Sequence, residues 1–207
     1  MVLKYYFSSP ISNAMRILFL CFTFLSFSLM AQDKLPFYEI PPAPETTASG
    51  NVLARMTQGL GYRFFWATKD LREEDLDYRP SNAAASAYET LEHLYGLSDM
   101  IRNTALSQPS KRPVETLPEG YENLRKATLL LLEEASQAFL SQTPAEIERL
   151  QLIIARGEKN YTFPIWNLIN GPLSDALYHT GQVVSFRRTT GNPIHPGVNV
   201  FMGKTKE

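Results

Sequence analysis

The chain has 207 residues, of which 20 are basic and 21 acidic, and its formal net charge is −1. This balance excludes the strongly basic surface typical of nucleic-acid-binding proteins, so we expect no nucleic-acid partner. The single cysteine, Cys21, lies near the N-terminus, which leaves the rest of the chain without a disulfide, a zinc–thiolate site or a cysteine nucleophile.

The first 31 residues have the pattern of a secretory signal peptide. Arg16 precedes the apolar run Ile17–Ala31, whose about 15 residues fall short of the roughly 20 that span a bilayer. We expect cleavage after Ala31 and an exported protein, periplasmic or secreted, with no stable membrane span afterwards. The alternative is an uncleaved N-terminal anchor, and both Met1 and Met15 are compatible start residues.

Residues 32–47 are rich in proline and lack periodicity, which predicts an extended lead-in. The first helix is expected to follow, with Thr47 or Ser49 as its cap. Gly59 and Gly61 lower its helix propensity, and we expect them to allow close approach of a neighbouring helix. The apolar positions of this helix follow helical spacing: Val52, Met56, Leu60, Phe64 and Ala67.

A polar connection, residues 71–80, is expected to have no core of its own. The second helix then has a clear start, because Ser86 and Glu89 have the spacing of a capping box. His93 falls at the edge of its apolar stripe, where a side chain can face a cleft instead of the sealed core. The stripe itself consists of Leu91, Leu94, Leu97, Ser98 and Ile101.

Prolines predict an irregular loop over residues 103–118, followed by a third helix from about Glu119 to Ser141. Thr143 and Glu146 form another capping-box pattern, with Pro144 at the first helical position. Two short apolar segments after it predict a β-hairpin before the last helix. The buried side of the third helix is expected to include Leu124, Leu131, Ala135 and Phe139.

The last helix is expected to begin with Thr162 as its cap and Pro164 at its first position. Gly171–Pro172 should kink or split it, because proline removes a backbone donor. Arg187 and Arg188 fall in its last turn, where positive charge complements the helix dipole, and Gly191 stands where a left-handed C-cap belongs.

Four helices joined by mostly polar connections predict an all-α fold, an antiparallel four-helix bundle over residues 48–191. Residues 192–207 lack periodicity and are expected to form an irregular tail. Such a bundle could form a homodimer through an apolar helix face.

Two of the three histidines lie on predicted helices. Asp175 and His179 are four residues apart, one helical turn, so their side chains share a face. With His93 they offer two imidazoles and a carboxylate, a ligand set for a divalent ion with open coordination sites, provided that the second and fourth helices face each other. The alternative is an ordinary surface pair. His195, in the tail, is expected to be solvated or to pack.

Three further residues are candidates for the surroundings of this site. Gln182 lies one turn after His179 and can hydrogen-bond a bound water. Glu89 lies one turn before His93 and can orient its free ring nitrogen, as metal-bound histidines usually require, although the capping box already uses this carboxylate. Tyr178 is the aromatic residue that we expect to touch a ligand.

These motifs resemble the DinB-like superfamily of metal-binding four-helix bundles. The resemblance rests on Leu91-Glu-His93-Leu, on Asp175-x-x-x-His179-Thr-Gly181-Gln182 and on the Arg-Arg-Thr-Thr-Gly-Asn-Pro that follows. It implies that His93 and His179 are two metal ligands. Asp175 stands where the family has a third histidine, and Thr180 where it has an arginine. A carboxylate is a competent ligand for zinc, manganese, iron or nickel.

The resemblance also implies a function. Family members with assigned activities are mostly transferases and isomerases that use low-molecular-weight thiols, and some resemble hydrolases. A transferase of that kind needs a cytosolic thiol pool, whereas this chain carries an export signal. We therefore expect a divalent-metal-dependent enzyme of the cell envelope, a hydrolase or a thiol-type transferase acting on a small molecule. The alternative is a non-catalytic four-helix binding or stress-response module in which Asp175 marks a degraded metal site.

Overall fold

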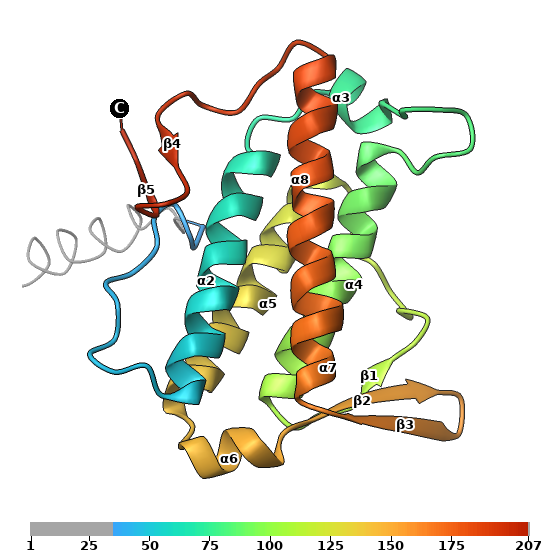
Figure 1. Ribbon diagram of the computed structural model, residues 1–207. Coiled ribbons are helices and arrows are strands. Elements are labelled where there is room, and N and C mark those ends of the chain that lie inside the picture. The colour runs from blue at the N-terminus through green and yellow to red at the C-terminus, as the bar shows by residue number, and fades with distance from the viewer. Residues whose placement is uncertain (1–34, 207) are drawn as a thin grey trace, which may run out of the picture. The chain divides into compact units, whose positions relative to one another are not determined.

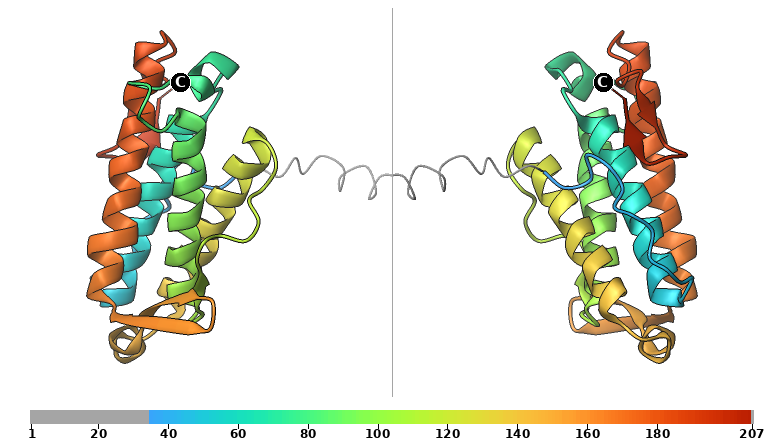
Figure 2. Two further views of the ribbon diagram at one scale, coloured as in Figure 1. Left: turned by 90° about the vertical axis from the view of Figure 1, so that its right-hand side faces the viewer. Right: turned by 90° about the vertical axis from the view of Figure 1, so that its left-hand side faces the viewer.

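The computed structural model describes residues 35–206 and has four long helices packed lengthwise (Figures 1 and 2). They are α2 (Ser49–Thr68), α4 (Ala87–Ala105), α5 (Tyr121–Ser141) and α8 (Ser174–Thr189). Contacts join α2 to α5, α5 to α4, α4 to α8 and α8 to α2, so the helices form a closed ring around one core. The predicted all-α four-helix bundle with a short hairpin is confirmed. The predicted signal peptide, residues 1–31, lies outside the described residues.

The core is built from one apolar stripe on each helix. All five stripe residues predicted for α4 are buried. On α2 the prediction was partly wrong: Val52 is 44% exposed, and its neighbours Leu53 and Ala54 are buried instead. On α5 the core takes Leu132, while the expected Leu131 is only partly buried. None of the helices within residues 35–206 is long and apolar enough to span a membrane.

The lead-in packs against α2. Phe37 is buried, and its ring lies 2.5 Å from the position that a Cβ on Gly61 would take. The indole Nε1 of Trp66 donates to the carbonyl of Tyr38 at 3.1 Å. Gly61 therefore makes room for the lead-in and not, as expected, for a helix. The predicted side-chain cap was also wrong, because the N-cap of α2 is Ala48, which makes no side-chain hydrogen bond.

The connection after α2 contains a short helix, α3 (Glu73–Asp77), and a fully buried carboxylate. Asp75 accepts hydrogen bonds from the backbone and side chain of Arg72 at 2.8–3.0 Å, from Nδ2 of Asn192 at 2.7 Å and from the Thr190 hydroxyl. Asp75 therefore ties α3 to the end of α8, while Leu71 and Leu76 of this connection pack with the core of the bundle.

The hydrogen bonds of Asp75 also determine its charge state. Burial alone would raise the pKa of this carboxyl. Hydrogen bonds from the Arg72 side chain, Thr190, the Arg72 backbone and Asn192 outweigh that effect and hold the pKa of Asp75 well below its usual range. The group is therefore an anion at neutral pH.

A small sheet closes one end of the bundle (Figure 1). The predicted hairpin is present as β2 (Gln151–Arg156) and β3 (Lys159–Pro164), which pair antiparallel. The loop before α5 is less irregular than expected, because β1 (Ser110–Lys111) adds to β2 in parallel. The predicted capping box opens α6 (Pro144–Arg149): the Thr143 N–H donates to Glu146 Oε2 at 2.8 Å.

The last helix begins later than predicted and in three pieces. Thr162 and Pro164 belong to β3, so neither opens a helix. The chain becomes helical at α7 (Trp166–Leu168), passes through a π turn, η1 (Ile169–Leu173), and continues as α8. Pro172 lies inside η1, so the expected interruption before Asp175 is confirmed.

At the end of α8 the predicted C-cap is confirmed, whereas the role of Arg187 differs from the prediction. Gly191 has φ +77, the left-handed conformation expected of a C-cap. Arg187, expected to complement its own helix dipole, is buried, and its Nη1 donates to three carbonyls at the end of α2, those of Trp66, Ala67 and Lys69, at 3.0–3.1 Å. It therefore fastens α8 to α2.

The tail is more ordered than expected. Residues Val198–Asn199 (β4) and Lys204–Thr205 (β5) pair as a short antiparallel hairpin. The backbone N–H of Ile40 in the lead-in donates to the carbonyl of Gly203 at 2.8 Å. The two ends of the described chain thus hold each other beside α2 (Figure 1).

Candidate metal centre

His93 on α4 and Asp175 and His179 on α8 meet between the two helices. Nε2 of His93 lies 3.2 Å from Oδ2 of Asp175, and Nε2 of His179 lies 3.3 Å from Oδ1. The two imidazole rings are 4.6 Å apart between centroids and nearly perpendicular. One ligand atom from each residue lies within 4.8 Å of the other two, so among the described residues these three form a group that could hold one ion.

The helices explain this convergence. His93 sits at the edge of the buried stripe of α4, on the side of buried Thr90 and Leu97, as predicted from the sequence. Asp175 falls in the first turn of α8, immediately after the π turn, and His179 follows one turn later. Because α4 and α8 are neighbours in the ring, the three polar side chains face each other at their seam.

Gln182 determines which nitrogen of His179 faces the site. Its amide oxygen Oε1 lies 2.7 Å from Nδ1 of His179 and can only accept, so Nδ1 carries the proton and donates. A neutral ring then has a lone pair on Nε2, which faces Oδ1 of Asp175 at 3.3 Å. Two acceptors at this distance attract each other only through a proton or a metal ion between them. The Gln182 contact therefore leaves Nε2 as the ring atom of His179 that is available to a metal ion beside Asp175.

The spacing of the ligand atoms fits a metal ion. Nitrogen and oxygen ligands lie about 2.0–2.1 Å from zinc, so neighbouring ligand atoms of a tetrahedral site are about 3.3 Å apart. The distances of 3.2 and 3.3 Å run from the two histidines to different oxygens of Asp175, and one ligand atom from each of the three residues lies within 4.8 Å of the other two, within reach of one ion. Two neutral imidazoles and one carboxylate are also a set that several divalent ions accept.

A pocket of about 240 Å³ opens beside the two imidazoles. It lies between α4, α8 and the loop that leads into α4. Its size suits only a small group, because pockets for drug-sized ligands start at about 300 Å³. Its walls are formed by Pro80, Ala84, Ala85, Glu89, Thr90, His93, His179, Gln182 and Phe186.

Glu89 lines this pocket but is held by other partners. Its Oε2 accepts the Ser86 backbone N–H at 2.8 Å, as the capping box predicts, and its two oxygens accept from the Arg79 guanidinium at 2.7 and 2.8 Å. The hydrogen bond from Arg79, followed by that from Ser86, lowers the pKa of Glu89 to about 2. In the described chain all its hydrogen bonds go to Ser86 and Arg79, and none to His93.

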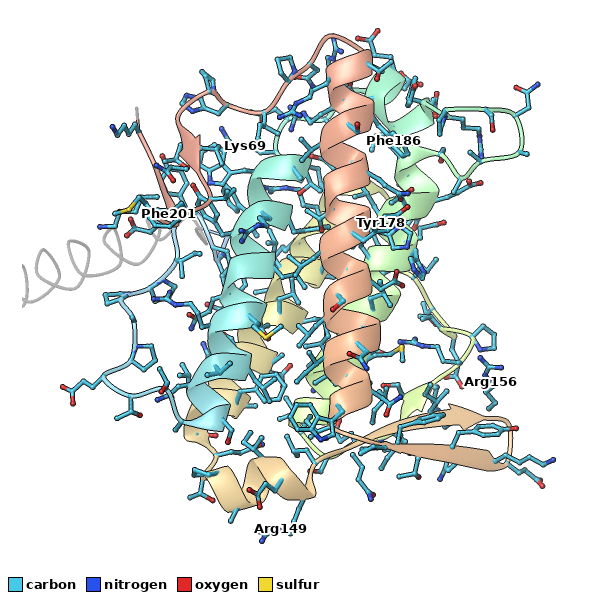
Figure 3. All side chains as sticks on the ribbon, in the orientation of Figure 1. Lys69, Arg149, Arg156, Tyr178, Phe186 and Phe201 are labelled. Atoms are coloured by element: carbon cyan, nitrogen blue, oxygen red, sulfur yellow. The ribbon has the colours of Figure 1, made fainter. Side chains whose placement is uncertain are left out.

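Tyr178 and His195 are not part of the group formed by the three ligand candidates. The Tyr178 side chain is on the outer face of α8 (Figure 3), is 64% exposed and touches His179 edge-on, with ring centroids 5.3 Å apart. His195 packs against Trp66, with centroids 5.8 Å apart, and its Nδ1 accepts the Gly197 N–H. His195 is thus a packing residue.

Sequence reasoning missed two features of the site. Arg79 precedes Glu89 by ten residues and fixes its carboxylate, but no local pattern links the two. Gln182 was expected to bind a water, whereas in the structure it holds the His179 ring. Its position three residues after His179 placed it on the correct face and was the available signal.

Comparison with known proteins gives one finding. A scan against protein-family models gave no match, and neither did a search of curated proteins. Among solved structures, the chain is similar to a DinB-like protein, YjoA of Bacillus subtilis, with a TM-score of 0.55 and 12% sequence identity. The similarity covers 70% of this chain and 96% of YjoA. The chain therefore has the fold of a DinB-like protein, as its motifs in the second and fourth long helices predicted.

Proposed function

We propose that His93, Asp175 and His179 bind a divalent metal ion, which is zinc, nickel, iron or manganese, and that the protein is a metal-dependent enzyme. The observation that carries this proposal is the meeting of two imidazole nitrogens and one carboxylate, from two helices, with one ligand atom of each within 4.8 Å of the other two. The DinB-like fold supports it, because the family that the motifs resemble binds metal ions between the same two helices.

Three protein ligands leave coordination positions for a water or a substrate. A bound divalent ion lowers the pKa of a coordinated water or thiol, or polarises a carbonyl. Two features of the chain would support such a reaction. Gln182 holds His179 in the tautomer that presents Nε2, and the pocket of about 240 Å³ gives a small reacting group access to both imidazoles.

The reaction class that we favour is hydrolysis. The signal-like N-terminal segment supports export, and an exported enzyme has water as its co-substrate but no cytosolic pool of small thiols. A thiol-type transferase is the second class that the metal site suits, since a coordinated thiol is also activated.

A non-catalytic binding or stress-response module is the alternative function. It is favoured by the exposure of the site, because the side chains of His93 and Asp175 are 50% and 42% exposed. Catalytic centres usually exclude water from the reacting groups, whereas a binding module has no such requirement.

Metal analysis of protein purified without added metal tests the proposal. We expect about one ion per chain in the parent protein and in H195A, a control that removes the histidine outside the site. H93A and H179A should lose the ion and keep their helix content in circular dichroism, since both side chains lie outside the core. A site that stays empty after metal soaking would refute metal binding. Full occupancy without turnover of ester, amide or phosphate substrates would favour the binding module.

A further inference from the structure

A groove of about 730 Å³ runs between α2 and α8, on the far side of α8 from the metal centre. Successive residues of a helix are about 100° apart around its axis. Except for Thr180, the α8 residues that line the groove therefore lie roughly 140–180° around the axis from His179. The groove is lined by Arg55, Met56, Gly59, Arg63, Leu177, Thr180, Gly181, Val184, Arg188, Ile194 and Val200.

Three arginines give this groove an uncompensated positive charge. Arg55 donates to the carbonyl of Pro41, and Arg63 to that of Gly59, each at 2.9 Å. Within residues 35–206 neither makes an ion pair, and the Arg188 guanidinium has no hydrogen-bond or ion-pair partner there. No acidic residue lines the groove. Four other arginines are paired with carboxylates: Arg72, Arg79, Arg102 and Arg112. Within the described residues the remaining four make no ion pair either: Arg125 and Arg187 are buried and donate to carbonyls, and Arg149 and Arg156 lie on the surface, outside the groove.

The remaining walls are apolar and leave open space. Two glycines keep the floor clear, since a Cβ at Gly181 would meet no atom within 4 Å and one at Gly59 would meet only the Arg63 guanidinium. A surface with three guanidiniums that make no ion pair within residues 35–206, together with an apolar floor, matches a ligand that is itself part charged and part apolar. The apolar side chains are those of Met56, Leu177, Val184, Ile194 and Val200.

The groove continues toward the turn between β4 and β5. A neighbouring hollow of about 520 Å³ shares Arg55, Gly59, Arg63 and Val200 with it. Phe201 and Met202 line this hollow and are 94% and 61% exposed. Their turn is held in place, because Asn199 Oδ1 accepts the backbone N–H groups of both residues at 3.0–3.1 Å. The hollow is also lined by Glu39 and Lys204, so an apolar chain leaving the groove would meet a mixed surface whose apolar part includes Phe201 and Met202.

We propose that this groove binds a single-chain amphiphile with an anionic head group, a carboxylate or a phosphate. Guanidinium groups pair with either head through two parallel hydrogen bonds, and the apolar floor takes the hydrocarbon chain. The volume lies in the range of small-molecule sites, about 300–1,000 Å³. An inorganic anion would leave the floor unused, and an uncharged lipid would leave the arginines unpaired. The proposal does not require the metal centre.

Isothermal titration calorimetry of the purified protein with dodecanoate and with dodecyl phosphate, each below its aggregation concentration, tests the site. We expect at least one of these probes to bind, at one molecule per chain. R63Q and R188Q should each weaken binding by about tenfold, the loss of one charge-assisted contact. R156Q is the matched control, because Arg156 is an exposed arginine on β2, outside the groove, and it should bind like the parent protein.

G181L tests the floor of the groove independently of its charge. The position is open and helical, so leucine fits there, favours the helix and fills the groove. We expect unchanged thermal stability or a small increase, together with loss of binding. The proposal is overturned if neither probe binds, if G181L or the two arginine variants bind like the parent, or if inorganic phosphate or dodecyltrimethylammonium binds as tightly. Since metal content is not measured here, failure leaves the metal proposal intact.

Discussion

The amide oxygen of Gln182 lies 2.7 Å from Nδ1 of His179, one turn back along α8. This contact sets the tautomer of the ring and should tune metal affinity. Q182L keeps the size of the side chain but removes the acceptor, so we expect zinc affinity to fall by about 10–100-fold. Competition with a chromophoric chelator measures this. Q182E retains an acceptor and should stay close to the parent; equal affinity of Q182L and the parent would contradict the assigned role.

Asp175 contacts both histidines, and its charge should decide whether an ion is held. D175N keeps the shape of the side chain but is a much poorer ligand for a divalent ion, so we expect calorimetric zinc binding to be lost. D77N makes the same charge change at an exposed position of α3 and should bind as the parent does. Retention of tight binding by D175N would show that the two histidines suffice.

Asp75 should make stability depend on pH in the acid range. Its folded pKa lies below the unfolded value, about 3.9, so its contribution is fully present above pH 5 and is lost as the pH falls through the folded pKa. We expect D75N to be about 1–3 kcal/mol less stable than the parent at pH 7 and to differ less at pH 3. Urea unfolding at a series of pH values measures this; a constant difference would argue against the lowered pKa.

Arg187 and Arg188 are adjacent, but we expect Arg187 to contribute much more to stability than Arg188. R187M leaves three carbonyls at the end of α2 without their donor, and we expect a loss of about 3 kcal/mol in the free energy of unfolding. R188Q changes an exposed side chain and should stay within about 0.5 kcal/mol of the parent. Thermal or urea unfolding of both variants compares them directly, and equal losses would contradict the fastening role of Arg187.

Local signals predicted the fold well because they act over a few residues. The capping boxes at Ser86 and Thr143 and the C-cap at Gly191 each depend on partners within five positions, and all three are present. The Thr162 and Pro164 signal failed because pairing of β3 with β2 provides backbone hydrogen bonds that a helix start there would not. Tertiary pairing overrode a correct local preference.

Long-range polar contacts were beyond the reach of sequence patterns. Thr190 donates to Asp75 across 115 positions, and Arg187 reaches Trp66 across 121. The three ligand candidates could be grouped because two share one helix face and the motif resemblance linked them to His93. The hydrogen bond of Gln182 depends on a side-chain rotamer, which spacing restricts but does not determine.

In the π turn before α8, the number of residues matters in a way that the identity of each residue does not. A π turn holds about one residue more than an α-helical turn, and each residue of a helix rotates the chain by about 100°. Removing a single residue from Ile169–Leu173 would therefore swing Asp175, His179 and Gln182 around the helix axis as one body, with their mutual distances intact. The buried residues of α8, including Val183 and Arg187, would turn with them, so one deletion would set the encounter with His93 against the packing of the helix without altering any ligand.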